Sequence, residues 1–164
     1  MTETTTGTAK VTLPADDQIL ITREFAAPRH LVYRAWTTPE LVKRFWAGKR
    51  GTMTTVEIDL RVGGRWRYAM VANGGFEVSF HGEYREIVPG ERLVHTEIYE
   101  QSGAPDDQGV LVTTTFVATG DRTTLTMLTE TGSKEVREAI IESGMEGGMQ
   151  EQMDALEELA VSLA

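Results

Sequence analysis

The sequence contains no cysteine, and its 164 residues include only three histidines and five prolines. The absence of cysteine excludes disulfide bonds, thiolate metal ligands and a cysteine nucleophile. The three histidines, His30, His81 and His95, show no paired spacing, so we predict neither a metal site nor a bound cofactor. No apolar run approaches the ~20 residues that a membrane-spanning helix needs.

The chain is acidic, with 25 Asp and Glu against 16 Lys and Arg and a net charge of -9. Because this charge repels phosphate backbones and anionic lipids, we predict no nucleic-acid partner and no membrane partner. The N-terminus, MTETTTGTAKVTLPADDQ, lacks the basic start and apolar run of a secretory signal, which favours a cytoplasmic location. We expect a mobile tail over residues 1–17 and a single domain over residues 18–164.

Two short amphipathic helices are predicted in the segment APRHLVYRAWTTPELVKRFW, residues 27–46. Apolar residues recur at helical spacing in both halves, and Pro28, Thr38 and Pro39 are residue types that favour helix starts. Strand-like segments are bounded by turn residues and cover 18–26, 54–60, 65–72, 76–88, 92–100, 110–118 and 123–131.

One long helical pattern ends the chain, from Ser133, a good N-cap, to residue 164. We therefore predict an α+β fold, with a curved antiparallel sheet of six to seven strands around a long C-terminal helix. Gly144, Gly147 and Gly148 interrupt the pattern, and each costs about 1 kcal/mol relative to alanine inside a helix. We expect a bend there, or the close approach of a backbone, a loop or a ligand.

The chain resembles the START/SRPBCC helix-grip superfamily and, within it, the family named after activators of the ninety-kilodalton heat-shock chaperone ATPase. Four segments carry the resemblance: FAAPRHLVYRAWTTPELVKRFW (25–46), DLRVGGRWRY (59–68), HGEYREIVPGERLVHTE (81–97) and ESGMEGGMQEQMDALEELA (142–160). The resemblance implies a helix-grip fold with a hydrophobic cavity between the sheet and the long helix. It also implies a chaperone as a partner, although eukaryotic co-chaperones of the family carry a separate N-terminal domain without a counterpart here.

The predicted ligand-binding residues are mostly aromatic or flexible apolar side chains on the strands and helices that would enclose such a cavity. They are Trp36, Phe45, Trp46, Trp66, Tyr68, Met70, Phe80, His95, Gly144, Met145, Gly147 and Met149. The alternative for each aromatic or methionine is ordinary core packing.

His95 and Glu97 are the candidate acid/base pair, because they lie two residues apart on one strand and share a face. Their orientation is left open by the sequence. The opposite face, with Val94, Thr96 and Ile98, is more apolar and would place His95 and Glu97 in water. The resemblance favours the inward orientation, since relatives often have an aromatic, apolar residue at the position of His95.

Three functions follow from these patterns. The favoured one is binding of a small hydrophobic or aromatic molecule between sheet and helix. The second is a cyclase-like or hydrolase-like enzyme that uses the same cavity, with His95 or Glu97 as the acid/base. The third is a protein-interaction role, as a co-chaperone or a homodimer, which would require an exposed apolar patch.

Overall fold

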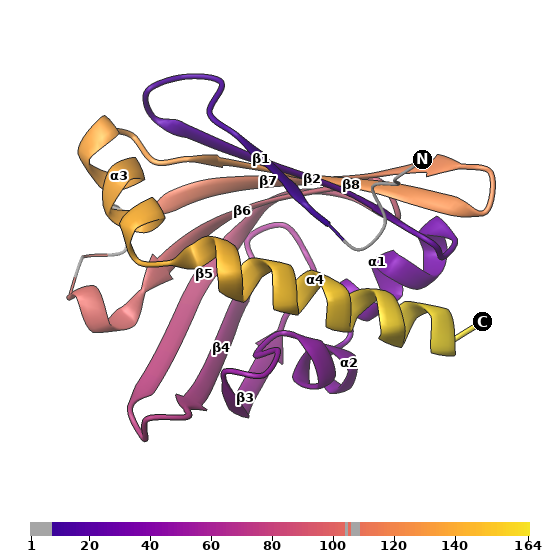
Figure 1. Cartoon of the computed structure of the whole chain (residues 1–164), viewed down its shortest axis with the longest axis horizontal. Helices are drawn as coiled ribbons and strands as arrows, with labels where there is room; N and C mark the ends of the chain where they lie inside the picture. The colour runs from indigo at the N-terminus through magenta and orange to yellow at the C-terminus, as the bar shows by residue number, and fades with distance from the viewer. Residues whose placement is uncertain (1–7, 104, 106–108) are drawn as a thin grey trace.

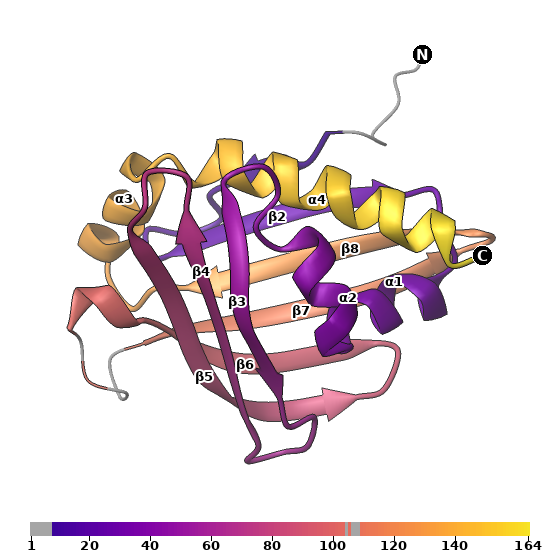
Figure 2. The ribbon, with the colours of Figure 1, turned by 90° about the horizontal axis from the view of Figure 1, so that it is seen from below.

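Eight antiparallel strands form one sheet in the computed structural model, which describes residues 8–103, 105 and 109–164. The strands are β1 (Lys10–Thr12), β2 (Gln18–Phe25), β3 (Gly51–Ile58), β4 (Arg65–Ala72), β5 (Glu77–Val88), β6 (Arg92–Tyr99), β7 (Val110–Thr119) and β8 (Arg122–Glu130). Their spatial order is β1-β2-β8-β7-β6-β5-β4-β3. Figure 1 and Figure 2 show that the sheet curves around the C-terminal helix α4. The predicted helix-grip architecture is confirmed.

The α-helices lie in the two segments where the sequence predicts them, residues 27–46 and 133–164, and a 3-10 turn that the sequence does not predict follows β6. They are α1 (Arg29–Thr37), α2 (Pro39–Phe45), the 3-10 turn η1 (Glu100–Ser102), α3 (Lys134–Glu142) and α4 (Met145–Ser162). Pro39 opens α2, and the Ser133 hydroxyl caps α3 by accepting a hydrogen bond from the Val136 N–H at 3.1 Å. Thr38 precedes α2 as predicted, but its side chain does not cap the helix. Its hydroxyl donates a hydrogen bond to the Arg34 carbonyl instead.

The hydrophobic core lies between one half of the curved sheet and the helices α1, α2 and α4. Alternate residues of β2, such as Ile19 and Phe25, point into it, as the period of two in an extended strand requires. Helix α4 contributes Met153 and Leu156, which are fully buried, and α2 contributes Phe45. This packing fixes α4 against the sheet and so determines how much of the sheet's concave face the helix covers.

The N-terminal boundary differs from the prediction that the domain begins at residue 18. Residues Lys10–Thr12 form β1, which pairs with β2, and Ala9 is buried in the core. A segment of three residues is too short to show a clear alternating pattern, which explains the eighth strand that the sequence analysis did not count. The part of the predicted mobile tail at residues 1–7 lies outside the described residues.

The C-terminal helical pattern consists of two helices that meet at Gly144. This glycine has a φ of 83°, in the left-handed region that other residues rarely adopt. Gly147 and Gly148 lie inside α4, where the lack of a side chain leaves room for the Arg50 side chain against both. A methyl group added to Gly147 would lie 2.7 Å from an Arg50 guanidinium nitrogen. The glycines thus allow the bend and the close approach of a side chain.

A buried arginine joins the sheet to α4. Arg23 has no solvent exposure in its side chain, and its guanidinium lies 3.0 Å from a Glu157 carboxylate oxygen and 3.3 Å from one of Asp154. The second Glu157 oxygen accepts the Ala26 N–H at 2.8 Å. Glu157 therefore compensates a buried charge and a backbone donor at the same time.

Replacing Glu157 with Ala should lower the free energy of unfolding by about 3 kcal/mol, because a buried guanidinium loses its closest counter-charge. Urea denaturation would measure the change. The matched control is Glu158→Ala, an exposed position on the same helix, which should change stability by less than about 0.5 kcal/mol. Equal losses in the two variants would contradict the role given to Glu157.

Candidate functional site

The concave face of β4, β5 and β6, called the inner face here, carries a cluster of aromatic side chains. Strand register places Tyr68 opposite Phe80 and Tyr84 opposite His95. The indole of Trp46, at the end of α2, contacts Tyr68 and Phe80 with ring centroids at 5.5 and 5.4 Å. Because α2 packs inside the curve of the sheet, these contacts identify the side on which the cluster lies.

His95 and Glu97 also lie on the inner face. Leu93, His95 and Glu97 follow one another at every second position of β6, so their side chains leave the strand on the same side. Leu93 is buried and belongs to the hydrophobic core, which identifies that side as the inner one. The His95 ring meets the Trp66 ring edge to face, with centroids 5.1 Å apart. The structure therefore resolves the orientation that the sequence leaves open.

One carbonyl group orients the His95 ring. The Thr96 carbonyl oxygen lies 3.0 Å from His95 Nδ1 and accepts a second hydrogen bond from Trp66 Nε1 at 3.2 Å. A carbonyl can only accept, so Nδ1 carries the proton and Nε2 of the neutral ring is an acceptor. Gly82 makes this arrangement possible, because a Cβ at that position would lie 1.9 Å from the same oxygen.

The protein environment disfavours the charged forms of His95 and Glu97. Burial lowers the pKa of His95 to about 4, although its hydrogen bond to Thr96 acts in the opposite direction. Burial raises the pKa of Glu97 to about 7 and raises the pKa of Tyr68 well above its ordinary value. No hydrogen bond or ion pair links the Glu97 carboxyl to another residue in the described part of the chain. Glu97 can therefore exchange a proton near neutral pH, whereas His95 is uncharged there and serves as a hydrogen-bond acceptor through Nε2.

Burial varies across the inner face. Tyr68, Phe80, His95, Glu97 and Val110 are half-buried, whereas Trp66, Tyr84 and Val112 on the same strands are buried. Under the other end of α4, Phe25 and Leu125 have no solvent exposure. The part of the inner face with the half-buried residues, called the accessible half below, is therefore covered less completely than the part that forms the core.

The predicted ligand-binding residues separate into three groups. Trp46, Trp66, Tyr68, Phe80 and His95 meet on the accessible half of the inner face. The second group packs in or against the core and consists of Trp36, Phe45, Met70, Met145 and Met149. The last two, Gly144 and Gly147, are exposed.

Three further residues belong beside this cluster and were missed by sequence reasoning. Tyr84 faces the His95 ring, Tyr99 contacts the Phe80 ring at 5.2 Å, and Val110 pairs with Glu97 across β6 and β7. Tyr84 could have been found from the sequence, since it falls at the same strand parity as Phe80.

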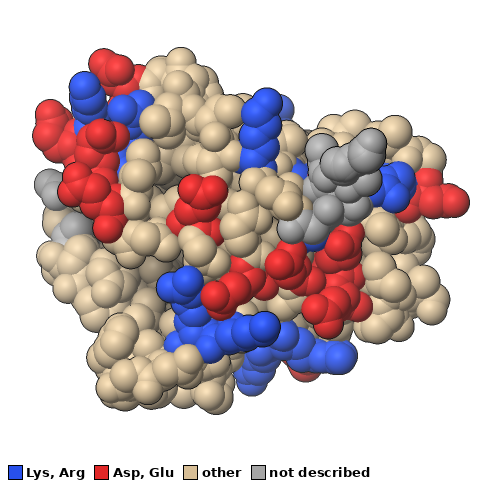
Figure 3. All heavy atoms as spheres, viewed as in Figure 1, with Lys and Arg blue, Asp and Glu red and all other residues tan. Residues whose placement is uncertain are grey.

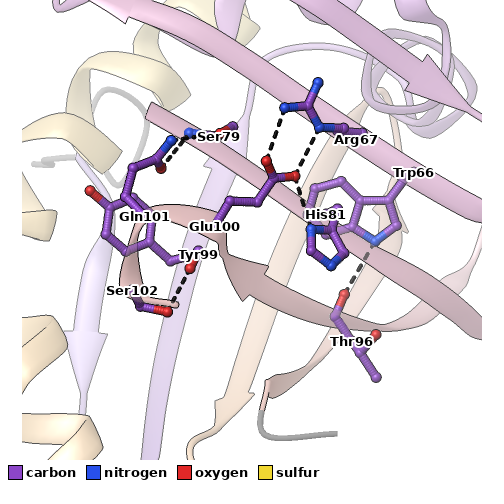
Figure 4. A network of polar contacts seen from close by, with 9 residues as sticks. All are labelled: Trp66, Arg67, Ser79, His81, Thr96, Tyr99, Glu100, Gln101 and Ser102. Atoms are coloured by element: carbon purple, nitrogen blue, oxygen red, sulfur yellow. Dashed lines mark hydrogen bonds and ion pairs between the residues drawn. The ribbon is translucent and has the colours of Figure 1, made fainter. Parts of the chain in front are cut away.

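The outer face of the same strands carries a separate polar network, drawn in Figure 4. The Glu100 carboxylate accepts two hydrogen bonds from Arg67 at 2.8 and 2.9 Å and lies 2.9 Å from His81 Nδ1. The Arg67 guanidinium, with His81 and Ser79, lowers the pKa of Glu100 to about 2. Gln101 extends the network by pairing with the backbone and hydroxyl of Ser79. These contacts attach η1 to the sheet, so His81 and Arg67 have a structural role here.

The curved antiparallel sheet around α4 defines the chain as an α+β domain of the helix-grip class. The family model described as "Activator of Hsp90 ATPase homolog 1-like protein" matches residues 26–160, and the chain belongs to that family. No curated protein matches the chain.

Solved structures share this fold at low sequence identity. A Rhodobacter sphaeroides protein is 24% identical, with a TM-score of 0.85, over 95% of this chain and 99% of that one. Protein Ms6760 from Mycobacterium smegmatis is 22% identical, with a TM-score of 0.82, over 94% of this chain and 98% of that one. An HSP90 activator from Plasmodium falciparum is 22% identical, with a TM-score of 0.55, over 70% of this chain and 72% of that one.

The described residues contain neither a membrane-spanning helix nor a cluster of metal ligands. No helix there is long and apolar enough to cross a membrane. No group of three or more His, Asp or Glu side chains is arranged to hold a metal ion within the same residues.

The raised pKa of Glu97 predicts a specific dependence of stability on pH. Between the ordinary pKa of 4.5 and about 7, the unfolded chain has lost this proton while the folded chain retains it. The free energy of unfolding should therefore fall as the pH rises through that window. Glu97→Gln should remove this fall. The free energy of unfolding of the variant minus that of the unmodified protein should therefore increase from about pH 5 to about pH 8 in urea titrations. A constant difference across that range would contradict the burial of the Glu97 carboxyl.

Proposed function

We propose that the protein binds a small, mainly apolar or aromatic molecule on the accessible half of the inner face. The observation that carries the proposal is the pair His95 and Glu97, which face inward, keep some solvent exposure and lie among aromatic rings. The ligand would lie between β4–β7 and the helices, in a hydrophobic cavity of the type that the family resemblance implies.

The energetic argument starts from the cost of these two polar groups. Desolvation disfavours the charged forms of both, and Glu97 has no compensating partner among the described residues. An apolar residue at either position would be less costly for folding. A polar ligand group that hydrogen-bonds to them would explain their presence, and this favours a binding site over ordinary core packing.

The ligand's chemistry follows from the groups that it would meet. Trp46, Trp66, Tyr68 and Phe80 supply aromatic surface suited to a flat apolar body. His95 Nε2 is an acceptor, so it favours a ligand with a hydroxyl or N–H group. Charged ligands are disfavoured by the same desolvation that shifts the pKa of Glu97.

Enlarging a side chain on this face should block the ligand. Val110 is half-buried beside Glu97, and Val110→Trp should lower the affinity for an aromatic ligand at least about tenfold, because the indole would occupy the space. Native mass spectrometry of the purified protein would first identify a bound compound, and titration calorimetry would then compare the variants.

The control is Val117→Trp on the same strand, where the side chain is 53% exposed and lies on the outer face. This variant should bind like the unmodified protein. The proposal fails if both variants retain the ligand equally, or if the purified protein carries none and binds no aromatic probe.

A second candidate is an enzyme that uses the same site, and the inward His95 with its accepting Nε2 supports it. His95→Phe keeps the ring but removes the acceptor. We expect about tenfold weaker binding of ligands with a hydroxyl group and unchanged binding of purely apolar ones. If the protein is an enzyme, the loss should appear in kcat. Equal weakening for both ligand types would indicate that His95 acts only through its shape.

Family membership supports a third candidate, an interaction with an Hsp90-type chaperone. The large exposed apolar side chains are spread over several connections and strands, and include Leu13, Val62, Phe76 and Val117. Because such single exposed residues are common on monomers, the surface itself adds no support for this candidate or for a homodimer.

A further inference from the structure

A basic patch lies outside the inner face, at the end of α2 and in the turn before β3. It consists of Lys43, Arg44, Lys49 and Arg50, which are all exposed. Residues 41–56 contain these four cations and no Asp or Glu, which gives the segment a net charge of +4 in a chain of net charge -9. The patch is therefore a local reversal of the protein's overall charge.

Little within the fold neutralises this charge. Arg50 lies 3.5 Å from Glu151, with both side chains partly exposed. No ion pair joins Lys43, Arg44 or Lys49 to another described residue. The dipole of α2 favours cations in its last turn and so accounts for Lys43 and Arg44. It does not account for Lys49 and Arg50, which follow the helix, so the patch as a whole is more than a helix cap.

A groove of about 230 Å³ lies beside the patch, between α2 and the start of β3. Lys43, Arg44 and Thr52 line it together with small residues, and most of the surface that it exposes is polar. The groove therefore suits a carboxylate or the backbone of an extended chain, with the cations beside it as donors.

We propose that the basic patch and its groove bind an acidic, extended segment of a partner protein. Four exposed cations spread over a helix end and a turn match several carboxylates along an extended chain. A single small anion would instead need donors that converge on one point and are shielded from water.

The neighbouring surface argues against a broad anionic partner. Figure 3 shows Lys and Arg atoms next to a band of Asp and Glu atoms on the same face. This band lies over α4, where Glu146, Asp154 and Glu158 are exposed. A membrane or a nucleic acid would meet the band as well as the patch, whereas a narrow peptide can contact the patch alone.

The test uses two labelled peptides, one rich in glutamate and one with glutamine at every glutamate position. Fluorescence anisotropy at low and physiological salt should show binding of the glutamate peptide that weakens with salt, and much weaker binding of the glutamine peptide. Lys43→Glu with Arg44→Glu should weaken binding about tenfold or more. Lys49→Glu alone should weaken peptide binding to a smaller extent. Because Lys49 lies in the turn after α2, a loss in this variant cannot be caused by unfolding of that helix.

The matched control is Lys10→Glu with Lys134→Glu, which changes the net charge equally at two exposed sites outside the patch. It should leave peptide binding within about twofold of the unmodified protein. Three results would overturn the proposal: equal losses in the two double variants, equal affinity for the glutamate and glutamine peptides, or binding of anionic phosphatidylserine vesicles but not of the peptides.

Discussion

The size of helix α4 relative to the sheet limits what the fold can bury. An 18-residue helix is about 27 Å long and about 10 Å wide with its side chains. Eight strands spaced about 4.8 Å apart make a sheet about 34 Å across. One helix cannot seal the whole inner face, even with α1 and α2 beside it. The half near β2 and β8 becomes core, whereas several residues between β4 and β7, such as Tyr68 and His95, are only half-buried.

The two halves of the inner face treat polar groups differently. The core half pairs the buried Arg23 with Glu157 and Asp154, whereas the accessible half carries His95 and Glu97, which have no ion pair among the described residues. The Thr96 carbonyl and the missing side chain of Gly82 orient the His95 ring, whereas no hydrogen bond to a described residue holds the Glu97 carboxyl. Burial disfavours the charged forms of both groups, so His95 is uncharged at neutral pH and the Glu97 carboxyl keeps its proton in part.

The sequence predicted the architecture well, because hydrophobic period and turn residues report directly on strands and helices. It could not predict the face of His95 and Glu97, because a period of two fits either face. The contact of the His95 ring with Trp66 and the position of Leu93 in the core identify the face. Strand β1 was missed because it is too short for a pattern. Gly147 was expected to mark a ligand, but the contact that it permits is with Arg50, an exposed residue 97 positions earlier that no local pattern relates to it.

A crystal of the protein pressurised with xenon would test the central claim most directly, since xenon binds in apolar spaces without needing a specific ligand. The account predicts xenon density on the inner face beside Tyr68, His95 and Val110. A structure without xenon there, in which these side chains pack directly against the helices, would contradict it and would reduce the inner face to an ordinary core.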